Sequence, residues 1–212
     1  RREDRIEDLH DLSGAQDLPH VASDDAGDYV IVWQSNGQDG SDYGIYAQLY
    51  NAAGVSEGSE FLVNSHTAKG QVEPAVAMDA EGDFVIAWRD PTYGISAQRY
   101  NAAGVAQGSA FQVITNTAGT HARPMVAMDS AGDFAVTWQA DGEDGSGYGV
   151  FARLYNSAGV AQGSQFQVNT YTMNNQQTAD IAMDSAGDFV VAWSSNNQDG
   201  SNYGVYAQRY NS

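Results

Sequence analysis

The sequence contains no cysteine, which excludes a disulfide framework and any thiolate metal site. Basic residues are also scarce: Lys and Arg number 9 against 27 acidic residues, and the formal net charge is −18. Because nucleic acids and anionic membranes are bound through basic patches, neither is an expected partner. No apolar run approaches the roughly 18 residues that span a bilayer, so we expect no membrane insertion. A positively charged leader is also missing, and we expect a mature or excerpted chain.

Repetition is the main feature that the sequence does have. The segment around each of its four tryptophans is nearly the same, as in GDYVIVW and GDFVIAW. A Tyr-Gly pair follows each Trp, and each such Tyr precedes the next Trp by 45 residues. One unit of about fifty residues therefore occurs four times. The tryptophans are Trp33, Trp88, Trp138 and Trp193.

The second unit predicts four short antiparallel strands, within residues 74–78, 83–88, 93–100 and 110–113. Such a meander cannot bury both of its faces alone, so neighbouring copies must cover them. The sequence therefore predicts an all-β fold, a four-bladed β-propeller, as one domain of residues 1–212. The predicted blades are residues 18–68, 69–118, 119–173 and 174–212. Each Trp follows apolar strand residues, which indicates packing between blades rather than sugar stacking.

The N-terminal residues 1–17 form a lead-in to the first unit. The last unit has only three predicted strands, so Arg5–Leu9 is a candidate for the fourth strand that would close the ring. The stretch is polar and tolerates helix, so a helical or disordered lead-in is the alternative.

The loops between each Trp and its Tyr are rich in Asp, Asn, Gly and Ser. Their carboxylates and carbonyls suit a hard cation or a sugar hydroxyl, although any exposed loop has a similar composition. In the second unit this loop is shortened to Arg89–Thr92. The candidate ligand-binding residues are Asp39, Asp144, Asp199, Tyr43, Tyr148 and Tyr203.

A second candidate site lies on the predicted axis. Each innermost strand carries an alanine small enough to let four backbones approach one another, and their carbonyls would then hold a calcium ion or another cation. A water-filled axis is the alternative. These alanines are Ala22, Ala77, Ala127 and Ala182.

Catalytic patterns are missing from the sequence. The histidines occupy no equivalent positions, and no nucleophile elbow or His-Glu-x-x-His segment occurs. A paired-carboxylate hydrolase would show itself as departures from the repeat. Departures exist at Glu73, Arg89, Asp90 and Arg123, but these residues are unremarkable, so we expect no enzyme.

The units also resemble the tandem repeats of large secreted bacterial surface proteins that often carry hemolysin-type calcium-binding (RTX) segments. The segments that carry the resemblance are Asp129–Trp138, Asp144–Tyr155 and Gly163–Thr170. This resemblance implies export and an extracellular or cell-surface setting. A four-bladed ring is also similar in shape to the hemopexin type of propeller.

These observations favour a secreted, non-enzymatic binding or assembly module with a protein or glycan partner. A carbohydrate-binding lectin with repeated sites on the post-Trp loops is the alternative, and a glycoside hydrolase is a third interpretation. Whether the chain forms a homo-oligomer, or is a segment of a longer protein, is left open.

Overall fold

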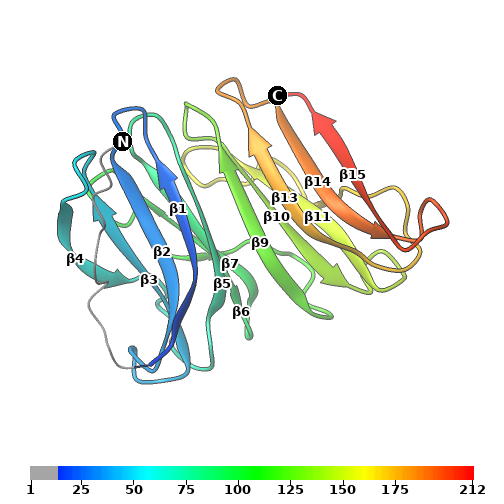
Figure 1. Ribbon diagram of the computed structural model, residues 1–212, viewed down its shortest axis with the longest axis horizontal. Coiled ribbons are helices and arrows are strands. Elements are labelled where there is room, and N and C mark those ends of the chain that lie inside the picture. Colours follow the sequence, from blue (N-terminus) through cyan, green and yellow to red (C-terminus); the bar gives the residue numbers. More distant parts are fainter. Residues whose placement is uncertain (1–13) are drawn as a thin grey trace.

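The computed structural model describes residues 14–212, and every regular element in that part of the chain is a β-strand. The described residues contain no helix that could span a bilayer. The strands form four antiparallel sheets, here called blades 1 to 4, and the chain passes through them in order (Figure 1). In each blade the strands follow one another as a meander, because short turns join consecutive strands.

Three blades have four strands and the last has three. Blade 1 consists of β1 (Gln16–Ser23), β2 (Tyr29–Asn36), β3 (Tyr43–Tyr50) and β4 (Ser56–Leu62). Blade 2 consists of β5 (Val72–Met78), β6 (Phe84–Asp90), β7 (Gly94–Tyr100) and β8 (Phe111–Gln112). Blade 3 consists of β9 (His121–Met128), β10 (Phe134–Asp141), β11 (Tyr148–Tyr155) and β12 (Phe166–Gln167). Blade 4 consists of β13 (Gln176–Met183), β14 (Phe189–Asn196) and β15 (Tyr203–Tyr210).

The repeated Asp-x-x-Gly turns link the strands of each blade. Asp79 accepts hydrogen bonds at Oδ1 from the amides of Glu81 and Asp83, both at 3.0 Å. Asp83 in turn accepts at Oδ1 from the amide of Ala102, in the turn after β7. Gly82 closes the turn at a φ of 91°, a conformation that glycine adopts without strain. These carboxylates therefore hold two turns together.

The blades stack through two different faces of each sheet. One face carries the tryptophan and is called the Trp face; the other is called the reverse face. In blade 2 the Trp face, with Phe84, Ile86 and Trp88, packs on the reverse face of blade 1, with Val30 and Val32. The same contact recurs between blades 2 and 3 and between blades 3 and 4. Three of the tryptophans thus pack between blades, as the sequence predicts.

The reverse face of blade 4 has no such cover. Val205 is 81% exposed there, whereas Ile45, Ile95 and Val150, its equivalents in blades 1 to 3, are fully buried. In Figure 1 this blade lies at one end of the row of sheets, opposite to blade 1.

The prediction of an all-β, four-bladed propeller is confirmed by this arrangement. The first strands of successive blades pack side by side, β1 with β5, β5 with β9 and β9 with β13, and form the inner wall. The proposed closing strand, Arg5–Leu9, lies outside the described residues.

Candidate functional site

The inner strands share an irregularity at the same position. In each, the pairing register with the second strand shifts, as it does between Val72 and Ala75 of β5. One residue in each irregularity has a left-handed backbone, which is uncommon for a side chain other than glycine. These residues are Leu18 (φ 49°), Glu73 (φ 57°), Arg123 (φ 52°) and Thr178 (φ 56°). Their side chains line a common cavity of about 280 Å³, here called the axial cavity.

The amides at these positions are satisfied by the neighbouring blade. Gln34 Oε1 accepts from the amide of Glu73 at 2.9 Å, and Gln139 Oε1 accepts from the amide of Thr178 at 3.1 Å. Blade 2 has Arg89 at the position that glutamine occupies in blades 1 and 3. Here the amide of Arg123 donates to Glu73 Oε2 instead, at 2.6 Å. Glu73, Arg89 and Arg123 are therefore coupled departures from the repeat.

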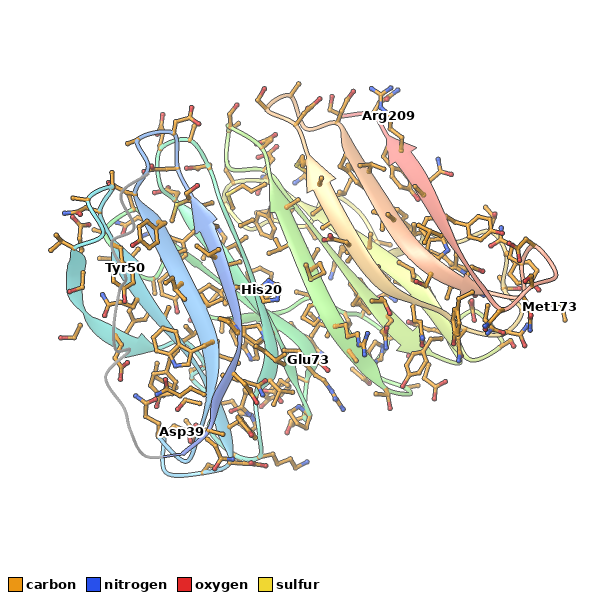
Figure 2. All side chains as sticks on the ribbon, viewed as in Figure 1. His20, Asp39, Tyr50, Glu73, Met173 and Arg209 are labelled. Atoms are coloured by element: carbon orange, nitrogen blue, oxygen red, sulfur yellow. The ribbon has the colours of Figure 1, made fainter. Side chains whose placement is uncertain are left out.

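The residue two positions after each left-handed residue of the inner strands also differs from blade to blade. These residues are His20, Ala75, Met125 and Asp180. His20 and Met125 line the axial cavity, and Asp180 interacts electrostatically with His20 although the two belong to the first and last blades. Figure 2 places His20 and Glu73 in the central part of the molecule, away from the loop of Asp39. A repeated scaffold thus surrounds a cavity whose wall is not repeated.

The electrostatics of the cavity favour a neutral histidine. Burial lowers the pKa of His20 below its ordinary value, and the nearby Asp180 carboxylate opposes part of that shift. The Arg123 guanidinium supplies a fixed positive charge, and its Nη1 donates to Thr178 Oγ1 at 3.1 Å. One carboxylate, one guanidinium and one imidazole therefore line the cavity, and the Asp180 carboxylate lies within electrostatic reach of His20.

The predicted loop carboxylates have a structural role in the described chain. Asp39, Asp144 and Asp199 each accept a hydrogen bond at Oδ1 from the amide two residues on, at 3.0, 3.2 and 3.0 Å. The other oxygen lies against the glycine of the Tyr-Gly pair; a Cβ added at Gly149 would be 2.7 Å from Asp144 Oδ2. Each carboxylate thus closes its own loop. In blade 1, Oδ2 of Asp39 is buried without a hydrogen-bond partner.

The predicted tyrosines begin the third strand of each blade and do not share a site. Tyr43 and Tyr148 are partly buried opposite Asn36 and Asp141, whereas Tyr203 is 48% exposed. Each tyrosine therefore stays a candidate ligand-binding residue within its own blade only.

The predicted axial alanines do lie on the inner strands. Ala22, Ala77, Ala127 and Ala182 pair with residues of the adjacent strand in each blade. Within residues 14–212 no three acidic or histidine side chains are grouped to hold a metal ion. The calcium ion on their carbonyls stays a prediction.

Sequence reasoning passed over the residues of the axial cavity although a signal was present. Three of the four inner strands contain a proline directly after the left-handed residue: Pro19, Pro74 and Pro124. Proline cannot donate to a ladder and is confined in sheets to edges and bulges, so its recurrence predicts an interrupted strand. The residue before each proline differs from blade to blade, and this position faces the axis.

No family model matches the chain, and no curated protein matches it. Solved structures do. An endo-arabinase from Bacteroides thetaiotaomicron matches with a TM-score of 0.54 and 15% identity, over 97% of this chain and 79% of its own. A GH43 endo-arabinanase from Bacillus licheniformis matches with a TM-score of 0.53 and 14% identity, over 92% and 73%. A Penicillium chrysogenum α-L-arabinanase complexed with arabinobiose matches with a TM-score of 0.57 and 10% identity, over 92% and 57%.

At these identities the likeness shows the fold alone. It nevertheless contradicts the prediction of a non-enzymatic binding or assembly module, because the proteins named above, which share this arrangement of sheets, are enzymes of glycan breakdown. The expectation that the chain is no enzyme is wrong for the same reason. That expectation treated the departures at Glu73 and Arg123 as unremarkable, whereas the fold brings both to one cavity. The resemblance to RTX-associated and hemopexin-type repeats stays a prediction.

Proposed function

We propose that the protein is a glycoside hydrolase and that the axial cavity is its active site. One observation carries the proposal: side chains that differ from blade to blade converge where the four inner strands meet. The wall of the axial cavity carries different side chains from different blades, although the strands around it repeat. The arabinanase-like fold supports a glycan as the substrate.

The chemistry of glycoside hydrolysis needs two carboxyl groups beside the scissile bond. One protonates the leaving oxygen, and the other activates water or attacks the anomeric carbon. Glu73 and Asp180 are the carboxylates of this region, from blades 2 and 4. Glu73 uses Oε2 to hold the amide of Arg123, which fixes the orientation of its carboxyl group. Arg123 and the neutral His20 would bind sugar hydroxyls and position the ring between the two carboxylates.

The test is hydrolysis by the full chain. Arabinan, and p-nitrophenyl glycosides of arabinofuranose, xylose and glucose, are incubated with the protein, and released sugar or nitrophenolate is measured. Glu73→Gln and Asp180→Asn should each lower the rate of cleavage by about 10²- to 10⁴-fold. Glu57→Gln is the matched control, because Glu57 is exposed on β4 and does not line the cavity. Full activity in Glu73→Gln, or no cleavage of any of these substrates, would contradict the proposal.

A further inference from the structure

A cavity of about 520 Å³ lies away from the axis at the outer part of blade 2. It is called the blade 2 cavity. Trp88 lines its floor, Tyr93 and Phe111 line its walls, and Ser65 and His66 come from the connection between blades 1 and 2. None of these residues lines the axial cavity.

The cavity exists because three departures from the repeat coincide. The first concerns the third strand. In blades 1 and 3 an aromatic ring stacks beside the tryptophan: Tyr46 beside Trp33 with ring centroids 6.3 Å apart, and Phe151 beside Trp138 at 6.4 Å. Blade 2 has Ser96 at this position, paired opposite Trp88. The space of one aromatic ring is therefore left open beside this tryptophan.

The second and third departures remove the outer cover. The loop after Trp88 is five residues shorter than the loops of the other blades. In blade 1 that loop contacts the outer strand, where Gln38 donates to Glu60, and in blade 3 Gln165 donates to Glu143 at 2.9 Å. Blade 2 has neither the loop nor the long side chain, because Ala110 occupies the position of Glu60. Three independent sequence changes thus clear the same volume.

The polar groups of the cavity are fixed in place. Asp90 is 2% exposed; its Oδ1 accepts from the amides of Thr92 and Tyr93 at 2.7 and 3.2 Å, and its Oδ2 lies 3.1 Å from His66 Nδ1. With Nδ1 donating to the carboxylate, His66 Nε2 is left as an acceptor. The His66 ring also contacts Tyr93 edge-on, with centroids 5.1 Å apart.

We infer that the blade 2 cavity is a binding site for a neutral sugar unit of a glycan chain. A flat apolar sugar face suits the position of the missing aromatic ring, and Tyr93, 45% exposed, offers a second ring surface. Hydroxyls of Ser65 and Ser96 and Nε2 of His66 supply polar contacts for the sugar hydroxyls. No Lys or Arg is among the lining residues, and Asp90 would repel an anion, so an anionic sugar is disfavoured. The inference goes beyond the proposed hydrolysis, because it needs neither Glu73 nor Asp180.

The test measures binding of arabinobiose, xylobiose, cellobiose and lactose to the full chain by calorimetry and by amide chemical shifts. At least one disaccharide should bind and shift the amides of His66 and Tyr93. Ser96→Tyr restores the ring that blade 1 has and should weaken binding at least tenfold while keeping the fold. Tyr93→Ala should weaken it similarly, and Val105→Ala is the control, because Val105 is exposed in blade 2 and does not line the cavity.

Hydrolysis and binding are separable in this design. Glu73→Gln should keep disaccharide binding at the blade 2 cavity, and Ser96→Tyr should keep cleavage of a small p-nitrophenyl glycoside. If no disaccharide shifts these amides, or if Ser96→Tyr binds as tightly as the unaltered protein, the inference is overturned whatever the outcome for hydrolysis.

Discussion

Two valines at the same position of successive repeats allow the contribution of blade packing to be measured directly. Val150 and Val205 each lie two residues after a Tyr-Gly tyrosine, in register opposite Gln139 and Ser194. Val150 is fully buried against blade 4, whereas Val205 is 81% exposed on the reverse face of blade 4. The change is Val→Ala at each position in turn.

Val150→Ala removes two buried methyl groups. At about 0.8 kcal/mol for each buried carbon, the transfer cost is roughly 1.6 kcal/mol, and the cavity left behind brings the total to about 2–3 kcal/mol. Val205→Ala removes mostly exposed carbons and should cost about 0.3 kcal/mol from burial. The chemical change is the same at both positions, so the difference between the two variants reports mainly on burial.

The assay is urea unfolding followed by tryptophan fluorescence, with thermal melting as a second measurement. For a chain of this size, Val150→Ala should lower Tm by roughly 4–12 °C and Val205→Ala by about 1 °C. If Val205→Ala destabilised the protein as much as Val150→Ala, the reverse face of blade 4 would be covered in solution, and the reasoning would fail.

Three further predictions concern single groups. Burial lowers the pKa of His121 below its ordinary 6.5, so the unfolded chain takes up the proton first as the pH falls. The free energy of unfolding therefore keeps its full value above pH 6.5 and falls as the pH drops below it. The unfolding curves of His121→Gln should depend less on pH in that range. Gly149→Ala should destabilise the fold by about 1–3 kcal/mol in urea unfolding, because its Cβ would strike the Asp144 carboxylate. Millimolar calcium should raise the Tm of the protein but not of Asp39→Asn, since Oδ2 of Asp39, Oε1 of Gln38 and Oε2 of Glu60 are buried without hydrogen-bond partners; equal shifts would exclude a cation there.

The regular parts of the fold could be predicted because local and repeated signals agree. Alternating apolar residues define β6, and Gly82 marks the turn before it. Burial of the tryptophans followed from the same alternation. The outer strands were less predictable: β8 has only two residues, Phe111 and Gln112, because the pairing of β7 with it is brief.

The sites could not be predicted in the same way because a repeat hides which positions share a space. Asp39 and its equivalents were predicted as ligand-binding residues because they recur. They recur because each of these carboxylates closes the loop of its own blade. Glu73 and Arg123 occur once each, 50 residues apart, and only the packing of β5 on β9 shows that they face one another. Two residues separated by one repeat occupy equivalent positions of neighbouring blades, and that separation alone does not predict that they are in contact.

The two cavities therefore follow one rule about a repeated scaffold. Several buried positions carry the same side chain in successive blades, as Phe84, Phe134 and Phe189 do. Side chains that differ between blades line both cavities, as Glu73 does at the axis and Ser96 does beside Trp88. Ser96 is informative in this respect, because it leaves a buried tryptophan without the ring that stacks on Trp33 in blade 1. The loss of this ring and the shortened loop uncover the same volume, and together they favour the proposed sugar site at the blade 2 cavity.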